Sequence, residues 1–214
     1  MLDAAREGED AMQSRAAIAE VYWKPLYVWL RVKWRRSNED AKDLTQDFFS
    51  MLFEAGLLAR YNPALGAFRS WIRGCMDNYV RKQDEFAGRQ KRGGDLRAVS
   101  LDAVAVGSET AEDLYLREWR RQIFQLALED LESMCRGPEL ELRHRLFVRY
   151  DLAEDARPGY AALALEFNIP VTSVTNHLAW ARRELRRLVT ARLEPVTAGP
   201  GEARAEAKVL FHQP

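Results

Sequence analysis

The sequence predicts an all-α protein built of two small helical domains joined by a flexible linker. Three observations support this. Apolar residues recur at helical spacing along most of the 214 residues, no convincing strand pattern interrupts them, and a stretch of small and polar residues without a period separates two helical blocks. Lys+Arg and Asp+Glu number 32 each, so the formal net charge is zero. Any basic surface for nucleic acid therefore has to be local.

The first domain is expected over residues 1–92. Pro25 lies inside its first apolar pattern and is predicted to kink that helix or to start a new one. Ser37 and Asn38 offer an N-cap for a second helix that begins with an acidic turn, and Gly56 is a suitable terminator. A turn marked by Pro and Gly at residues 61–66 precedes the third helix. The three helices are expected at residues 16–34, 39–55 and 68–89.

Carboxylates form a stripe on the second helix. Asp40, Asp43 and Asp47 are spaced three and four apart, which places them on one face beside Gln46. The stripe is either a solvated acidic face or a surface that meets a basic partner helix. Catalytic or metal-binding carboxylates would need matching ligands elsewhere, so we predict no catalytic residue, no metal site and no cofactor. Thr45, on the same helix, is a candidate phosphorylation site.

The third helix interleaves aromatic and basic residues. This composition suits single-stranded DNA, because bases stack on rings while cations follow phosphates. The same aromatic residues equally fit a core stripe at helical spacing, and Trp71 is open to either role. The residues in question are Phe68, Arg69, Trp71, Arg73, Asn78, Tyr79, Arg81 and Lys82.

The second half of the chain is predicted to be helical as well. Residues 93–112 are expected to form the linker, residues 113–194 the second domain and residues 195–214 a disordered tail rich in Pro, Gly and Ala. Helical periodicity resumes at residues 111–134 and 139–150, ahead of a loop marked by Pro and Gly.

A helix-turn-helix pattern ends the second domain. Asn168 stands at the turn, where a left-handed backbone is required, and Asn tolerates that conformation better than any residue but Gly. Pro170 prevents the first helix from continuing, and Thr172 is expected to cap the second. The inward face of the second helix carries Val174, Leu178 and Ala181.

The outward face of that helix carries hydrogen-bonding, stacking and phosphate-seeking groups. A recognition helix presents such groups to base edges, so we predict DNA binding rather than a helical hairpin with a solvated Arg-rich face. A basic band for the DNA backbone follows, with Arg182, Arg186, Arg187 and Arg192.

The order of these motifs is informative. YWKPLYVWLR, EDAKDLTQDFF, NPALGAFRSW, QKRGG followed by SLD, and then the helix-turn-helix together resemble bacterial RNA polymerase sigma factors of the extracytoplasmic-function (ECF) type, over residues 18–192. The resemblance implies a non-catalytic subunit that binds core RNA polymerase and directs promoter recognition and transcription initiation. It also implies promoter DNA and an anti-sigma factor as partners, and no membrane.

The resemblance assigns three sets of residues. The acidic helix would bind the clamp of the β′ subunit through Asp40, Asp43, Leu44, Gln46, Asp47 and Phe48. The turn and third helix would melt the minus-ten element and capture a flipped base through Asn62, Phe68, Arg69, Ser70, Trp71, Asn78, Arg81 and Lys82. The second domain would dock on the β flap and bind the minus-thirty-five element through Thr172, Ser173, Thr175, Asn176, His177, Trp180, Arg183 and Arg186.

Three acidic residues depart from the family pattern. Asp77, Asp84 and Glu85 stand where similar sequences usually carry basic or neutral residues. They either weaken contact with the minus-ten element or face away from the DNA.

The alternatives to this function are a stand-alone regulator and an enzyme. A stand-alone helix-turn-helix regulator would act as a dimer on a palindromic site. An enzyme is disfavoured, because the three histidines are isolated in sequence and no phosphate-binding loop occurs. Cys75 and Cys135 lie in apolar helical patterns without metal spacing, and the N-terminal residues lack a signal-peptide pattern, so we expect a cytoplasmic protein.

Overall fold

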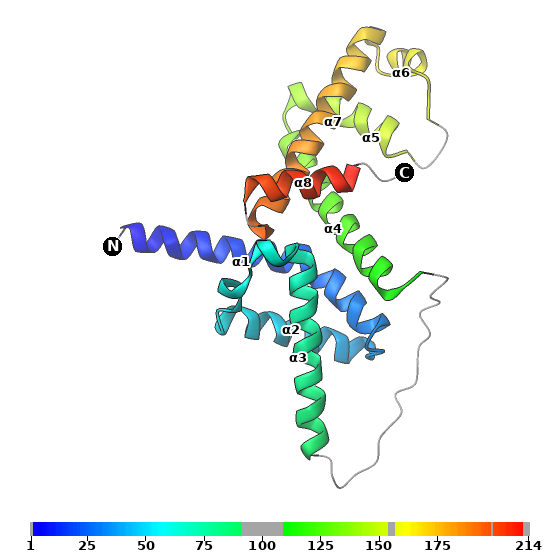
Figure 1. The fold of residues 1–214 in the computed structure, drawn as a ribbon. Helices are drawn as coiled ribbons and strands as arrows, with labels where there is room; N and C mark the ends of the chain where they lie inside the picture. Colours follow the sequence, from blue (N-terminus) through cyan, green and yellow to red (C-terminus); the bar gives the residue numbers. More distant parts are fainter. Residues whose placement is uncertain (1, 91–108, 154–156, 198, 212–214) are drawn as a thin grey trace. The chain divides into compact units, whose positions relative to one another are not determined.

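The computed structural model describes residues 2–90, 109–153, 157–197 and 199–211 (Figure 1). Over these ranges the chain forms eight α-helices and three short 3-10 helices, with no β-strand. The prediction of an all-α fold is confirmed. None of the helices in these ranges combines the length and the apolar character that crossing a bilayer requires.

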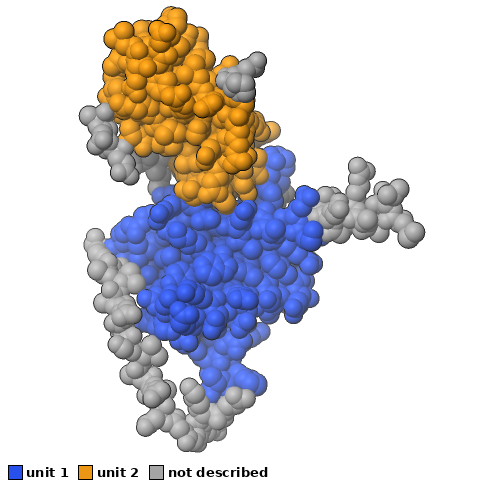
Figure 2. Space-filling model, turned by 180° about the vertical axis from the view of Figure 1, so that it is seen from behind, with its two compact units in different colours: residues 1–122, 194–202 blue, residues 123–193, 203–214 orange. Residues whose placement is uncertain are grey.

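The chain divides into two compact units (Figure 2). Unit 1 comprises residues 1–122 and 194–202, and unit 2 comprises residues 123–193 and 203–214. The boundary after residue 122 falls inside helix α4 (Ala111–Met134), so this helix starts in unit 1 and ends in unit 2. Most of the linker predicted at residues 93–112 lies outside the described residues.

Helix α1 (Leu2–Val32) is longer than its apolar period suggested, and it contains Pro25 in its interior. The expectation that a new helix starts at Pro25 is wrong. Tyr22 and Leu26 flank the proline and are fully buried, so packing on both sides holds the helical conformation despite the missing N–H.

Helix α2 (Asn38–Glu54) begins and ends where the sequence predicted. The backbone N–H of Asp40 donates to Ser37 Oγ at 3.1 Å, as in an N-cap. Gly56 adopts φ 60°, a left-handed conformation that glycine reaches without steric cost. Two 3-10 helices follow, η1 (Leu57–Arg60) and η2 (Pro63–Leu65).

Helix α3 (Phe68–Gln90) supplies one side of the unit 1 core. Its buried residues recur every four positions, which directs one stripe toward α1 and α2. The core side chains of the three helices include Leu26 and Leu30 of α1, Phe48 and Leu52 of α2, and Phe68, Ile72, Met76 and Val80 of α3.

Asp77 of α3 is a buried anchor for the end of α1. Its carboxylate accepts hydrogen bonds from Trp29 Nε1 at 2.8 Å, Trp34 Nε1 at 2.7 Å and Lys33 Nζ at 3.1 Å. Burial alone would raise the pKa of Asp77, but these hydrogen bonds and the Lys33 charge together lower it, so the carboxylate is ionised. The departure from the family pattern at Asp77 is therefore structural.

Asp84, another of these acidic residues, contacts the segment between α1 and α2. Both of its oxygens accept from Arg36 Nη2, at 2.5 and 2.6 Å. Glu85 is exposed. Asp77 and Asp84 are thus both engaged in contacts within unit 1.

Unit 2 combines the second half of α4 with α5 (Pro138–Asp151), α6 (Tyr160–Glu166) and α7 (Val171–Leu193). Helix α7 packs against both α5 and α6. Two ion pairs connect α7 to α5 and to α4. Arg182 donates to both oxygens of Asp151 at 2.9 Å, and Arg192 donates to both oxygens of Asp130 at 2.6 Å.

The prediction of a disordered tail is wrong for most of residues 195–214. The 3-10 helix η3 (Glu194–Val196) continues α7, and helix α8 (Pro200–Phe211) follows. The tail composition, rich in Pro, Gly and Ala, concealed a helical period: Ala203, Ala207 and Leu210 lie on one face and are buried. The Phe211 ring lies edge-on to Phe124, with 5.2 Å between centroids.

Candidate nucleic-acid and partner surfaces

The acidic stripe of α2 is exposed as the spacing predicted. Asp40, Asp43, Gln46 and Asp47 are all exposed, whereas Leu44 is half-buried. Phe48, predicted to contact the partner, is 0% exposed and belongs to the core. The usable surface is therefore a narrow carboxylate face, which offers charge rather than apolar area to a partner.

Thr45 does not belong to that surface. It is 0% exposed, and its hydroxyl donates to the Ala41 carbonyl at 2.6 Å. A phosphate in the place of this buried hydroxyl would be strongly unfavourable. The structure therefore disfavours phosphorylation of Thr45 in the folded protein.

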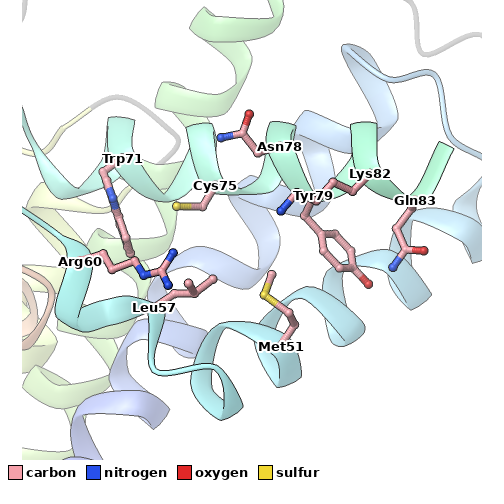
Figure 3. Close-up of a pocket in the computed structure, with 9 residues that line it drawn as sticks. All are labelled: Met51, Leu57, Arg60, Trp71, Cys75, Asn78, Tyr79, Lys82 and Gln83. Carbon is pink, nitrogen blue, oxygen red and sulfur yellow. The ribbon is translucent and has the colours of Figure 1, made fainter. Parts of the chain in front are cut away.

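A pocket of 410 Å³ opens where α2, η1 and α3 meet (Figure 3). Trp71 and Tyr79 extend from α3 toward Leu57 of η1 and Met51 of α2 in this view. The volume falls in the range of small-ligand sites, and the lining combines ring faces with polar groups. The lining residues are Met51, Leu57, Arg60, Trp71, Cys75, Asn78, Tyr79, Lys82 and Gln83.

The chemistry of this pocket suits a base and its phosphate. Two aromatic rings supply stacking faces, two cations supply charge, and two side-chain amides supply donors and acceptors. Burial is the main reason that the pKa of Tyr79 is raised. The hydrogen bond with Gln83 opposes this effect, and the Asp47 charge adds a smaller upward contribution. Burial also raises the pKa of Cys75, so both groups are protonated at neutral pH and neither is a nucleophile.

The residues predicted to contact minus-ten DNA separate into three groups. Trp71, Asn78 and Lys82 come together in the pocket. Asn62, Ser70 and Arg81 are exposed outside the pocket lining, and Asn62 Oδ1 accepts from the Ala64 N–H at 3.0 Å, which fixes the turn. Phe68 is only 5% exposed and packs in the core, so its assignment to DNA is wrong.

Arg69 is held by the first half of α4. Its guanidinium carbon lies 5.3 Å from the centroid of the Trp119 ring, and its carbonyl accepts from the Tyr115 hydroxyl at 2.8 Å. One turn further along α3, Arg73 Nη1 donates to Glu112 Oε1 at 2.6 Å. In this structure both arginines are used for packing within unit 1 rather than for an open surface.

Sequence reasoning named Trp71, Asn78, Tyr79 and Lys82 but missed five pocket residues: Met51, Leu57, Arg60, Cys75 and Gln83. A signal for Cys75 was present. Trp71, Asn78 and Lys82 are spaced by seven and eleven positions, which is one helical face, and positions 75 and 79 lie on the same face. Nothing in the sequence pattern indicated Arg60, because it reaches the pocket from η1.

The turn between α6 and α7 has the predicted geometry. Asn168 adopts φ 52°, and the N–H of Ile169 donates to the Ala164 carbonyl at 3.0 Å. Helix α7 begins one residue before Thr172, however, and the Ser173 N–H donates to the Pro170 carbonyl. Thr172 is thus inside the first turn and is not the cap.

The outward face of α7 is polar, as predicted. The inward residues Val174, Leu178 and Ala181 are buried. His177 and Trp180 lie at the flank and are half-buried, and the Arg143 guanidinium lies 4.7 Å from the Trp180 ring centroid. The exposed members of the predicted set are Thr172, Thr175, Asn176, Arg183 and Arg186, and Ser173 is half-buried.

Part of the predicted basic band is used for ion pairs within unit 2. Arg182 and Arg192 are paired with carboxylates within unit 2, and Arg187 Nε donates to Glu184 at 2.7 Å. Arg183 and Arg186 are exposed on the same polar face of α7. Phosphate contacts by α7 would therefore fall mainly to these two side chains.

No family model matches the chain, and neither a curated protein nor a solved structure matches it. Among the described residues, no group of three or more His, Cys, Asp and Glu side chains is placed to hold a metal ion. The function is therefore inferred from the surfaces themselves.

Proposed function

We propose that this protein is a sigma factor of the extracytoplasmic-function type, which binds core RNA polymerase and directs it to promoters. It acts without catalysis, as a binding subunit in the cytoplasm. Its finer architecture is two domains with a linker between them, the second a helix-turn-helix domain that binds duplex DNA.

One observation carries this proposal: unit 1 combines an exposed carboxylate stripe with an aromatic and cationic pocket. The two surfaces adjoin, because the Asp47 charge acts on Tyr79 in the pocket. A carboxylate stripe suits a basic protein partner, and a pocket with rings and cations suits an unpaired nucleotide. A protein that holds polymerase while it opens a promoter needs both at once.

Unit 2 supplies a plausible second contact. Asn168, in a left-handed conformation, forms the turn between α6 and α7. The exposed Thr175, Asn176 and Arg183 of α7 offer donors and acceptors to the major groove. In the proposed role α7 binds the minus-thirty-five element, and its small number of exposed arginines is compensated by the DNA affinity of the polymerase.

The alternative is a stand-alone dimeric regulator. Helix α7 would serve that function equally well, but the stripe of α2 and the pocket beside it would then have no use. A regulator of that kind binds a palindromic duplex tightly without polymerase, whereas the proposed sigma factor binds duplex promoter DNA tightly only together with polymerase.

The decisive experiment is co-elution with core polymerase. The purified protein is mixed with bacterial core RNA polymerase and passed over a size-exclusion column, and the same is done with Asp43→Arg. Because Asp43 is exposed at the centre of the stripe, the substitution reverses charge without disturbing the core. We expect co-elution of the native protein and its loss, at least tenfold in affinity, in the variant.

Glu85→Arg is the matched control, since Glu85 is exposed on α3 and makes the same change of charge outside the stripe. It is expected to co-elute like the native protein. If the folded native protein does not bind a polymerase that accepts other sigma factors, or if both variants bind as well as the native protein, the proposal is refuted.

A further inference from the structure

The segment after α7 returns to unit 1. Residues 194–202 belong to the same compact unit as α1, α2 and α3. The 3-10 helix η3 packs against α1, and Val196 is 1% exposed. Burial of an apolar side chain is the usual sign that a segment is bound rather than merely near.

The same segment also reaches the turn ahead of α3. The Tyr61 hydroxyl lies 3.0 Å from Glu202 Oε1 and 3.0 Å from the Gly66 carbonyl oxygen. A phenol has one proton, so the two acceptors share one donor. The carboxylate of the C-terminal segment is thereby held against the turn at residues 61–66.

Tyr61 connects this contact to the pocket. Its ring centroid lies 5.5 Å from that of Trp71, a pocket residue, and 5.1 Å from that of Phe68 in the core. Asn62, the next residue, is among those predicted to meet DNA. The segment therefore places a negative charge at Tyr61, whose ring contacts the pocket residue Trp71.

We propose that residues 194–202 cover the turn at residues 61–66 and must leave it before single-stranded DNA binds there. This inference rests on the proposed function and concerns the regulation of the same site. Glu202 excludes a phosphate by like charge and occupies the Tyr61 hydroxyl.

The test is the affinity of the full-length chain for a fluorescein-labelled, random-sequence 20-nucleotide single-stranded DNA, by fluorescence anisotropy at low salt. Glu202→Gln removes the charge and is expected to tighten binding about threefold, the size of one exposed charge interaction. Val196→Asp ejects the segment. It is expected to tighten binding about tenfold if the covered state is ten times as populated as the open one.

Glu194→Gln is the matched control, because Glu194 is an exposed glutamate of the same segment. It is expected to leave the affinity unchanged. Hydrogen exchange gives an independent readout: amides of residues 194–197 should be protected in the native protein and lose protection when the oligonucleotide is added.

The outcomes separate this inference from the function on which it rests. Measurable and equal binding by the native protein, Glu202→Gln and Val196→Asp overturns the covering role and leaves the DNA site intact. Persistent protection of residues 194–197 in the DNA complex overturns it as well. If none of the proteins binds, the DNA site of unit 1 is refuted and the inference falls with it. Should Val196→Asp be unfolded by circular dichroism, Glu202→Gln and hydrogen exchange decide.

Discussion

Helices α3 and α7 are both 23 residues long and both were predicted to meet DNA, yet their side chains serve different ends. In α7 the buried residues form one stripe, and the polar residues opposite it are exposed. In α3 one side faces the core, another holds the end of α1 and the start of α4, and a third lines the pocket. The lesson is that a binding face can be predicted for a helix only when its packing is confined to one side.

The difference has a physical origin in the residue types. The outward face of α7 is largely uncharged and polar, and such residues have little to gain from burial. Arginine and tryptophan in α3 have long apolar parts, so they pack readily against neighbours while the polar ends find partners. The contacts of Arg69 with Trp119 and of Arg73 with Trp29 are two examples.

The largest effect is expected from Asp77 on α3. Asp77→Ala removes the acceptor of two indole N–H groups and the partner of Lys33, and leaves buried donors without a partner. We expect a loss of about 3 kcal/mol in the free energy of unfolding, measured by urea denaturation. Asn176→Ala, on the exposed face of α7, should change it by less than about 0.5 kcal/mol.

Acid should weaken the same anchor. Because the pKa of Asp77 is lower in the folded protein than its ordinary value of 3.8, its stabilising contribution is complete above that value and is lost as the pH falls below it. Urea denaturation of Asp77→Ala should thus show a weaker loss of stability below about pH 4 than the native protein. Equal stability of Asp77→Ala and Asn176→Ala would contradict the contrast between the two helices.

Periodicity predicted most helices of this chain, but burial of individual side chains was harder to foresee. The cap at Ser37, the terminator Gly56 and the left-handed Asn168 each follow from local backbone chemistry, and each is confirmed. Phe48 was assigned to a partner surface through the family resemblance, although the helical phase places it in the core. Local signals fix where a helix begins, whereas its contacts depend on neighbours distant in sequence.

The C-terminal tail illustrates the same limit. Its composition predicts disorder, and only the spacing of three small or apolar residues, Ala203, Ala207 and Leu210, indicates a helix. Alanine contributes little hydrophobic signal, so the period is faint. The contact between Glu202 and Tyr61 joins residues far apart in the chain, and no local pattern could have predicted it.

A smaller effect is expected at the turn that orients α7. Asn168→Ala places an alanine in the left-handed region, where it lacks the side-chain amide that helps asparagine to adopt this conformation. The substitution should lower the free energy of unfolding by about 1 kcal/mol. Asn168→Gly should be close to neutral, because glycine adopts this conformation freely. Thermal unfolding followed by circular dichroism measures both. A neutral Asn168→Ala would mean that the turn does not constrain α7, and the contrast with α3 would lose its geometric basis.

The smallest effect is expected at the flank of α7, where His177 is neither fully buried nor fully exposed. Burial, and then the nearby charge of Arg143, lower the pKa of His177 below its ordinary 6.5. Protonation therefore disfavours the folded state, and the free energy of unfolding falls as the pH drops below that value. Arg143→Gln should raise the pKa of His177 while leaving it below 6.5, since burial is the larger cause.

The imidazole resonances in an NMR titration report this directly. Arg145→Gln is the control, because its guanidinium lies over Phe167 instead, and it should leave the titration unchanged. An identical His177 titration in all three proteins would show that Arg143 does not govern the charge of the helix flank.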